Sequence, residues 1–369
     1  MFSLMERRFE PAIPGRGAQG SEVPTRFGLA TRETDGDWRD YMEALAETEG
    51  EAPAKLRTRV TEEHPRSILS FNQSPDIFFD RSINAYRGCE HGCVYCFARP
   101  THAYHDLSPG LDFETQLFAK PNAAELLRAT LAKSKYRPRP IAMGTNTDPY
   151  QPIERTYRIT RDVLEVCLDA RHPVTITTKS DRVLDDIDLL AELAERRLVA
   201  VAISVTSLDP KLSGKLEPRA AAPAKRLIAL QKLVDAGVPS HCSVAPVIPA
   251  ITDEFMEEIV QRAAAIGVDS VGWIPLRLPY EVAPLFREWL SVHYPDRGDK
   301  VMSIVQSIRG GKDNDPDFFS RMRPTGVWAD LFRARFLLAC KRAALGKTKF
   351  ELDCTQFRPP AVGGQLRLL

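Results

Sequence analysis

The sequence has 369 residues, of which 43% are hydrophobic and 27% charged, so it is typical of a folded protein rather than a disordered one. Its 50 Lys and Arg residues nearly balance its 49 Asp and Glu residues, which excludes a whole-molecule field that would attract nucleic acid or an acidic membrane. The longest apolar run, 198–205, is far too short to span a bilayer, and the charges in 1–10 are atypical of a signal peptide. We therefore expect a cytoplasmic protein with no membrane partner.

The first part of the chain, residues 1–66, differs in composition from the rest. It contains Gly-Arg-Gly at 15–17, several prolines and an acid-rich stretch from Glu33 to Glu51. Such a composition predicts a poorly ordered N-terminal arm, with one short helix where apolar periodicity occurs at 38–45.

From residue 82 onward, short apolar runs alternate with segments of helical periodicity. The alternation predicts six βα units, arranged either as a partial TIM barrel or as a doubly wound open sheet. The expected strands are 83–86, 141–144, 174–178, 199–205, 241–247 and 270–274, and the expected helices are 123–133, 160–170, 183–196, 224–236 and 253–266. Gly237 and Gly267 are expected to end two of these helices, and Thr252 is expected to begin another as an N-cap.

The alternation stops after residue 275, and mostly helical segments follow at 282–292, 300–307 and 315–345. We therefore divide the chain into an arm (1–66), an α/β core (67–277) and a helical C-terminal extension (278–369). In both candidate architectures of the core, functional residues gather at the carboxyl ends of the strands.

Seven cysteines are an odd number in a chain without an export signal, which favours metal ligands or free thiols over disulfides. Cys89, Cys93 and Cys96 fall within eight residues in a loop after the first strand, where Gly88 and Gly92 allow the backbone to turn sharply. Three thiolates are one short of a closed four-ligand site. Either a nearby histidine (His91, His102 or His105) completes a zinc site, or an iron stays open for another ligand.

The Cys-x3-Cys-x2-Cys spacing, with the aromatic Tyr95 directly before the last cysteine, resembles the radical S-adenosylmethionine (radical SAM) superfamily. The resemblance covers about residues 80–277 and implies a partial (β/α)6 barrel of the TIM type. It also implies that Cys89, Cys93 and Cys96 bind a 4Fe-4S cluster, whose open iron chelates S-adenosylmethionine. Reduction of the cluster, by an electron donor such as flavodoxin or ferredoxin, would then produce a 5′-deoxyadenosyl radical.

A narrower resemblance rests on three segments: 84–89 (Asn-Ala-Tyr-Arg-Gly-Cys), 147–154 (Thr-Asp-Pro-Tyr-Gln-Pro-Ile-Glu) and 178–180 (Thr-Lys-Ser). They are similar to the branch that contains spore photoproduct lyase, which implies DNA as a candidate substrate. That lyase uses a cysteine near its second strand to return a hydrogen atom to the product. The corresponding stretch here, 144–147, has no cysteine, so the resemblance does not extend to this hydrogen donor.

Several polar residues are expected to contact the cofactor because they follow the predicted strands. Lys179 offers a cation for the methionine carboxylate and matches the lysine of the lyase-like branch. The other candidates are Tyr95, Thr145, Asn146, Asp148 and Ser204, with Thr206 as a further ribose contact or an ordinary barrel filler. Glu217 and Arg219 either line the same cavity or form a surface ion pair, and we expect the pair because it is the commoner outcome. Cys242 and Cys354 are alternative hydrogen donors.

Two basic runs bear on the substrate. Residues 320–369 contain ten Lys or Arg against three acids, and Lys133, Lys135, Arg137 and Arg139 form a second run. They favour a nucleic acid slightly as the partner of an otherwise monomeric enzyme. Modification of a protein, a peptide or RNA, and a non-enzymatic zinc module, are the alternatives.

Overall fold

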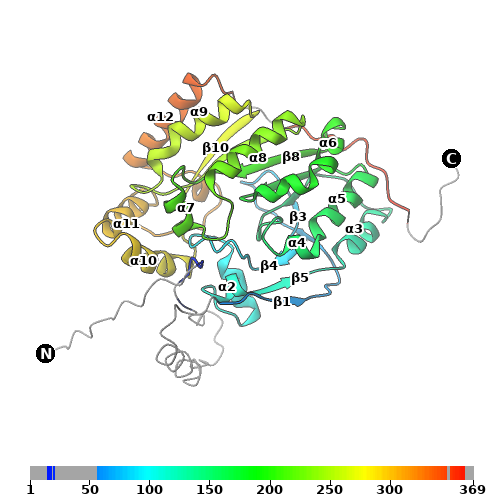
Figure 1. Cartoon of the computed structure of the whole chain (residues 1–369), viewed down its shortest axis with the longest axis horizontal. Helices are drawn as coiled ribbons and strands as arrows, with labels where there is room; N and C mark the ends of the chain where they lie inside the picture. The colour runs from blue at the N-terminus through cyan, green and yellow to red at the C-terminus, as the bar shows by residue number, and fades with distance from the viewer. Residues whose placement is uncertain (1–14, 19, 21–55, 347–349, 362–369) are drawn as a thin grey trace.

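The computed structural model describes residues 15–18, 20, 56–346 and 350–361 (Figure 1). Within these ranges the main sheet has seven strands in the order β10-β9-β8-β7-β6-β3-β2. All neighbouring strands are parallel except β2 and β3, which are antiparallel. The strands are β2 (Leu69–Phe71), β3 (Arg81–Ile83), β6 (Ile141–Met143), β7 (Val174–Thr178), β8 (Val199–Ser204), β9 (Ser240–Val247) and β10 (Ser270–Pro275).

The strand order decides between the two architectures that the sequence allowed. From β3 to β10 each parallel strand lies beside the next one along the chain, without the reversal of order that defines a doubly wound sheet. A sheet that grows in one direction curls into a barrel, and six parallel strands within the described residues make an incomplete one. The predicted partial (β/α)6 barrel of the TIM type is therefore confirmed.

The central strands form because their residues suit a sheet that is buried on both faces. In β7 and β8, valine and isoleucine pair in register, with Val174 opposite Val199 and Ile176 opposite Val201. All four side chains are buried. Because β-branched residues pack well on a pleated surface and no polar alternation interrupts them, these strands were readable from sequence.

Helices follow each of these strands and cover the outside of the barrel (Figure 1). They bury leucines at three- and four-residue spacing, as in Leu127 with Leu131 and Leu230 with Leu233. The helices are α3 (Ala123–Leu131), α4 (Glu154–Tyr157), α5 (Ile159–Asp169), α6 (Ile187–Glu195), α7 (Pro210–Leu216), α8 (Pro223–Asp235) and α9 (Met256–Ile266), with 3-10 turns η3 (Asp181–Asp186) and η4 (Asp253–Phe255).

The expected helix ends are confirmed at the glycines but not at Thr252. Gly237 and Gly267 have φ of 71° and 89°, the left-handed conformation that ends a helix at low cost. The Thr252 hydroxyl accepts no hydrogen bond from the helix and instead accepts one from the Ile248 backbone N–H at 2.8 Å. Thr252 therefore closes the turn after β9 rather than capping η4, and the N-cap prediction was wrong.

A second, three-stranded sheet, within the part of the chain described, has the order β1-β5-β4. It consists of β1 (Arg59–Glu62), β4 (Tyr86–Arg87) and β5 (Gln116–Ala119), and the helices η2 (Arg99–His105) and α2 (Asp112–Thr115) precede β5. The poorly ordered arm predicted for residues 1–66 therefore extends too far, because residues 59–62 form a strand that pairs with 116–119. The helix expected at 38–45 lies outside the described residues.

The C-terminal extension is helical, as expected, with α10 (Val282–His293), α11 (Gly298–Ser307), η5 (Ser320–Met322) and α12 (Val327–Arg342). The segment 309–322 connects the two edges of the barrel sheet. At the β10 edge, Arg309 donates a hydrogen bond to the Leu276 carbonyl at 3.0 Å. At the β2 edge, Arg321 forms a two-pronged ion pair with Asp76, at 2.7 and 2.5 Å, in the loop between β2 and β3.

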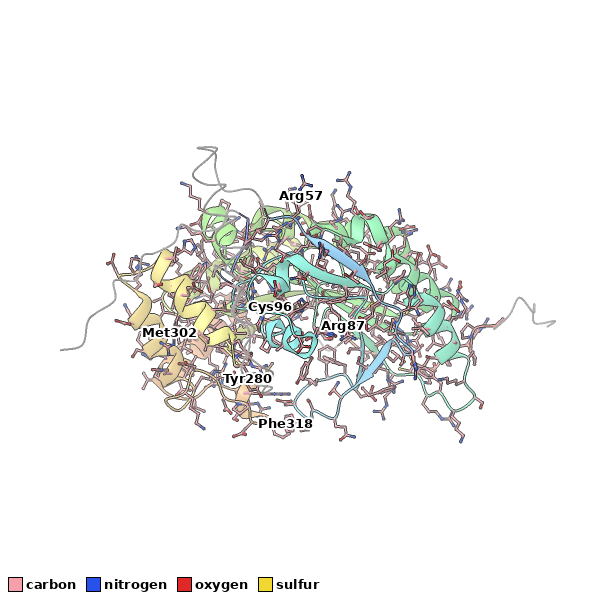
Figure 2. The ribbon with its side chains drawn as sticks, turned by 90° about the horizontal axis from the view of Figure 1, so that it is seen from below. Arg57, Arg87, Cys96, Tyr280, Met302 and Phe318 are labelled. Atoms are coloured by element: carbon pink, nitrogen blue, oxygen red, sulfur yellow. The ribbon has the colours of Figure 1, made fainter. Side chains whose placement is uncertain are left out.

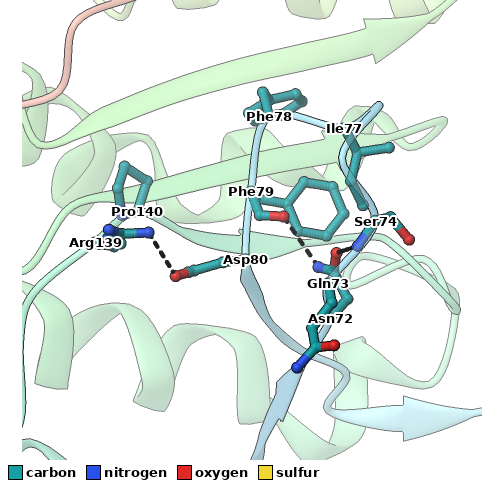
Figure 3. A pocket seen from close by; sticks show the side chains of 9 residues that line it. All are labelled: Asn72, Gln73, Ser74, Ile77, Phe78, Phe79, Asp80, Arg139 and Pro140. Atoms are coloured by element: carbon teal, nitrogen blue, oxygen red, sulfur yellow. Dashed lines mark hydrogen bonds and ion pairs between the residues drawn. The ribbon is translucent and has the colours of Figure 1, made fainter. Parts of the chain in front are cut away.

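The end of the barrel at which the strands begin carries a small cavity of about 330 Å³ (Figure 3). It lies inside the 72–80 loop, where Arg139 pairs with Asp80 at 3.1 Å. The described part of the C-terminal tail also lies at this end, since the Asp353 and Arg358 backbone N–H groups bond to carbonyls just before β8 and β7. Cys354 and the basic run Lys133–Arg139 are therefore at the opposite end of the strands from the cysteine loop.

Candidate metal centre and cofactor site

The three clustered cysteines occupy a tight loop that starts after β4 and lies beyond the carboxyl end of β3. Cys96 lies on the face seen in Figure 2, between Arg87 and Tyr280 in that view. Gly88 and Gly92 have φ of 72° and 66°, so the loop turns twice in a conformation that other residues adopt only with strain. The glycines therefore have the role that the sequence predicted for them.

The thiols of the loop are close enough to influence one another. Cys89 and Cys93 are buried and Cys96 is half-buried. Burial raises the pKa of all three thiols, and the charges of Asp148, Cys93 and Cys96 raise that of Cys89 further. Like charges that repel in a dry loop require a positive counterpart to become thiolates together. Three neighbouring thiols with this requirement fit an iron-sulfur cluster, which would supply that positive charge.

A wholly buried arginine, Arg99, supports the cysteine loop, and the sequence did not predict this role. Arg99 donates hydrogen bonds to the carbonyls of Gly92 and Cys93, at 3.2 and 2.9 Å, and to those of Pro109 and Gly110, both at 2.9 Å. Its charge is balanced by Glu114 at 2.5 Å, which is also buried. Because the guanidinium fork binds several acceptors at fixed angles, Arg99 fixes the backbone path around the cysteines.

A short N-terminal segment completes this support. The backbone N–H groups of Gly17 and Ala18 donate to the two carboxylate oxygens of Glu114 at 3.0 and 2.8 Å, and Arg16 donates to the Glu114 carbonyl at 2.9 Å. A Cβ on Gly17 would lie 1.8 Å from the Gly92 carbonyl oxygen, so the segment touches the cysteine loop directly. The predicted arm therefore contributes to the site.

Lys179 lies at the end of β7, as predicted, and its side chain faces the cysteine loop. Its Nζ is 5.8 Å from the centroid of the Tyr95 ring, and its charge lowers the pKa of Cys93 and Cys96 in opposition to burial. The Tyr95 hydroxyl donates to Glu217, a carboxylate that also accepts from Arg226. The structure thus places Lys179 and Tyr95 beside the buried ion pair of Glu217 and Arg226.

Glu217 and Arg219 do not form the surface ion pair that we expected. Glu217 is buried and pairs with the buried Arg226 of α8, whereas Arg219 pairs with Glu90 at 3.0 Å. Burial opposes ionisation of Glu217, but Arg226 and Lys179 outweigh it and lower its pKa to about 2. The position of Arg226 in the sequence could have indicated this pair. Arg226 lies in the first turn of α8, from which its side chain reaches the preceding loop that carries Glu217.

Thr145, Asn146 and Asp148 follow β6, but their polar groups are already engaged by the protein. Thr145 and the Asn146 backbone N–H both donate to the Asn84 side-chain oxygen, at 3.2 and 3.0 Å. Asp148 accepts from the Thr178 hydroxyl at 2.6 Å and the Lys179 N–H at 2.8 Å, and it lies 3.3 Å from His91. Asp148 thus connects β6, β7 and the cysteine loop, and a direct contact with a cofactor stays a prediction for all three residues.

Ser204 and Thr206 both lie at the carboxyl end of β8 and are buried. The Thr206 hydroxyl is 2.6 Å from Glu217 and 3.3 Å from the Tyr95 hydroxyl, so it belongs to the same polar network. The Ser204 carbonyl accepts a hydrogen bond from Arg226 at 3.0 Å. The role of the Ser204 side chain at a cofactor stays a prediction.

The histidines proposed as a fourth ligand are each engaged elsewhere. His91 faces Asp148, His102 lies 2.8 Å from the Gln116 carbonyl, and His105 packs on Phe118 with ring centroids 5.3 Å apart. Within the described ranges, no three Cys, His, Asp or Glu side chains converge on one point as ligands of a single ion do. A cluster spreads its irons over several positions, so its ligands need not converge in this way.

Comparison with known proteins adds the family. A model of the radical SAM superfamily matches residues 83–263, which include the three cysteines and the strands from β4 to β9, whereas β10 lies beyond the match. The chain belongs to the radical SAM superfamily. The match lies inside the predicted core, whose boundaries at 67 and 277 stay a prediction.

Curated relatives of this radical SAM chain share about half of its length or more. An uncharacterized protein of Mycobacterium tuberculosis is 38% identical over 220 residues, which are 59% of this chain and 65% of that protein. An uncharacterized protein of Methanocaldococcus jannaschii is 30% identical over 171 residues, 46% of this chain and 61% of that protein. The alignments thus span just under two thirds of these relatives.

Among solved structures, a single-substitution variant of spore photoproduct lyase has a TM-score of 0.53 at 14% identity, covering 77% of this chain and 79% of that one. Another variant of the lyase, bound to dinucleoside spore photoproduct, has a TM-score of 0.51 over the same shares. At this identity the likeness shows the fold alone. The radical SAM fold of the lyase is therefore the fold of this chain. In the described part of the chain, no helix has the length and hydropathy needed to cross a membrane.

Proposed function

We propose that this chain is a radical SAM enzyme that cleaves S-adenosylmethionine reductively at a 4Fe-4S cluster held by Cys89, Cys93 and Cys96. The observation that carries the proposal is the position of three mutually repelling thiols in one loop at the carboxyl ends of the barrel strands. When bound, the cluster and S-adenosylmethionine together supply a 5′-deoxyadenosyl radical. The residues of the chain bind these groups and exclude water from them.

Lys179 is the residue that we assign to the carboxylate of S-adenosylmethionine. Its ammonium group lies 5.8 Å from the centroid of the Tyr95 ring in the cysteine loop, and its backbone N–H donates to Asp148 at 2.8 Å. A cation held at the rim of the loop would attract the carboxylate of an amino acid that binds there. The buried pair of Glu217 and Arg226 holds the Tyr95 ring against Lys179 and so orients this group.

For the substrate we propose a nucleic acid. Phe97, directly after Cys96, exposes 54% of its surface, and Tyr280, in the segment after β10, exposes 66%. Exposed aromatic rings near a reaction centre are platforms on which bases stack. The likeness to a lyase that binds a dinucleoside photoproduct supports the same class. A protein or peptide as the modified molecule is the second candidate.

The test of the cofactor is anaerobic reconstitution with iron and sulfide, followed by reduction with dithionite. We expect about four irons per chain and conversion of S-adenosylmethionine to 5′-deoxyadenosine and methionine. Cys93→Ala should lose iron and cleavage, whereas Cys354→Ala, at the opposite end of the strands, should keep both. A tightly bound zinc without visible absorbance would instead show a zinc module.

The substrate is tested by transfer of label. Deuterium-labelled DNA, RNA and peptides are supplied in turn, and 5′-deoxyadenosine is examined by mass spectrometry for the label. Label from DNA or RNA supports the proposal, and label from peptide alone contradicts the nucleic-acid assignment.

A further inference from the structure

A cavity of about 550 Å³ opens beside the cysteine loop, among the loops that follow β6, β7 and β8. One part of its wall is His91, which stands between Cys89 and Cys93 in the loop. The remaining wall comes from the loop after β7, the loop after β8 and the short helix α4. The loop that we assign to the cluster is thus accessible to a partner from this side.

The cavity is rich in cations. Arg155, Arg182, Arg219 and Lys225 line it, against only Asp181 and Asp185. Arg182 pairs with Asp185 at 2.6 Å, and Lys225 lies 3.8 Å from Asp181. The Nε of Arg182 is buried and has no hydrogen-bond partner among the described residues, and Arg155 has no ion-pair partner among them either. The surface therefore attracts an anionic partner.

This cavity and the proposed cofactor side lie on opposite sides of one backbone segment. Ser180 lines the cavity, and its backbone is extended, with φ of −108° and ψ of 138°. Neighbouring side chains in extended backbone point to opposite sides. Lys179, its neighbour, points instead toward the Tyr95 ring. A molecule in the cavity therefore approaches the cysteine loop from behind, away from the group assigned to S-adenosylmethionine.

The two partners of a radical SAM enzyme have different geometric needs. The substrate must touch the radical, so it has to enter on the cofactor side. An electron, in contrast, crosses a short stretch of protein, so its donor needs only to come close to the cluster. A cationic cavity behind the cysteine loop meets the second need and not the first.

Resting on the function proposed above, we propose that this cavity and its rim are the docking surface for an acidic electron-carrier protein of the flavodoxin or ferredoxin type. The carrier is oxidised by one electron and the cluster is reduced by one, with no bond made or broken. Complementary charge accelerates such encounters at low salt and orients them, and interfaces for electron transfer are small. Ala220–Ala222 in the wall add no long side chains that would keep the carrier away from the loop.

The pattern of charges favours an acidic protein over a nucleic acid. Three of the four cations already have an acidic neighbour: Arg182 pairs with Asp185, Lys225 lies near Asp181, and Arg219 pairs with Glu90. A protein surface of mixed charge can satisfy such a pattern, whereas a uniform chain of phosphates cannot. Continuous cationic tracks are what single strands of nucleic acid require.

The experiment uses the reconstituted holoenzyme and two matched double variants. Arg155→Glu with Lys225→Glu reverses two exposed charges of the cavity, and Lys300→Glu with Lys312→Glu reverses two exposed charges on the C-terminal extension. Bleaching of the cluster absorbance is followed after mixing with reduced flavodoxin, and separately with photoreduced deazariboflavin, a small neutral donor. Iron content and circular dichroism confirm that each variant is loaded and folded.

We expect the cavity variant to be reduced by flavodoxin at least about tenfold more slowly at low salt, with the difference fading as salt rises. The control variant and all reactions with the neutral donor should be unchanged. The double variant Arg155→Ala with Lys225→Ala should be reduced by flavodoxin at a rate between those of the cavity Glu variant and the control variant.

Equal rates with flavodoxin for both Glu variants would overturn the docking surface while leaving the enzyme proposal intact. Failure of the neutral donor to reduce any cluster would instead count against the proposed function. Competition by a short DNA or RNA strand, measured as slower reduction by flavodoxin but not by the neutral donor, would assign the cavity to a nucleic acid and overturn our choice of partner.

Discussion

The guanidinium of Arg99 and the carboxylate of Glu114 form an ion pair at 2.5 Å, wholly buried beneath the cysteine loop. Burying two charges carries a desolvation cost that their attraction barely repays, so such a pair seldom exists for stability alone. Here the arginine also binds four carbonyls of the loop and its surroundings. The pair therefore fixes the backbone geometry of the cysteine loop.

We predict that Arg99→Lys will load much less iron than the unchanged protein. Lysine keeps the charge opposite Glu114 but cannot reach four carbonyls with one point-like group. Iron per chain after reconstitution is the measurement, and Arg128→Lys, in an exposed pair with Asp169, is the control. Full loading of Arg99→Lys would mean that the charge alone supports the loop.

Gly92→Ala tests the close approach between the cysteine loop and Glu114. A Cβ at residue 92 would lie 2.7 Å from a Glu114 oxygen, and φ is 66°. Gly310→Ala is a matched control, because its φ is 63° but the space around it is open. Both variants should lose roughly 1 kcal/mol of unfolding free energy from backbone strain, and Gly92→Ala should lose about 2 kcal/mol more. Urea unfolding of the iron-free protein measures this, and equal losses would show that the loop accommodates a methyl group.

Lys179→Ala should weaken binding of S-adenosylmethionine about tenfold or more while leaving the iron content unchanged. The loss of one charge-assisted hydrogen bond accounts for that magnitude. Isothermal titration of the reconstituted protein gives the affinity. Lys225→Ala, on α8, should bind as the unchanged protein does, and an unaltered affinity of Lys179→Ala would remove Lys179 from the site.

Glu154 predicts a pH dependence of stability. Burial raises its pKa from 4.5 to about 7, although Tyr86 and the Thr160 N–H donate to it. The folded state therefore binds a proton that the unfolded state has lost, and the free energy of unfolding falls by about 3 kcal/mol as the pH rises from 4.5 to about 7. Glu154→Gln cannot ionise and should lack this fall. Unfolding of both iron-free proteins in urea across this range gives the comparison, and parallel pH curves would contradict the assignment.

The ion pair of Asp76 and Arg321 holds the segment that spans the gap between β2 and β10. Asp76→Asn should therefore make trypsin cut after Arg321 several-fold faster, because the segment opens more often. Asp330→Asn, in an exposed pair on α12, is the control. Peptide mapping of timed digests gives the rates, and unchanged cleavage would show that other contacts hold the segment.

The sequence was sufficient for features that depend on local pattern. The Val and Ile runs of β7 and β8, the leucine spacing of the helices and the cysteine spacing each lie within about ten residues. The sheet of β1, β4 and β5 was missed because Arg59–Glu62 is mostly polar and exposed and pairs with residues far along the chain.

The buried charges were missed for a related reason. Arg99 and Arg226 look like solvated cations when read alone, since arginine is seldom fully buried. Only folding brings Glu114 and Glu217 to them. Pairings of this kind depend on tertiary structure. The predicted ion pair of Glu217 with Arg219 was wrong because the two residues are close in sequence but pair with other residues in the fold.

The contact of residues 15–18 with the cysteine loop also bears on oxygen sensitivity. A chain that begins after residue 20 would lose the two N–H groups that bind Glu114 and the backbone that covers Gly92. The cluster loop would then be open to dissolved oxygen and to chelators on that side. Residues 15–18 therefore shield this side of the cysteine loop, and we expect a variant that lacks them to lose a reconstituted cluster faster in air.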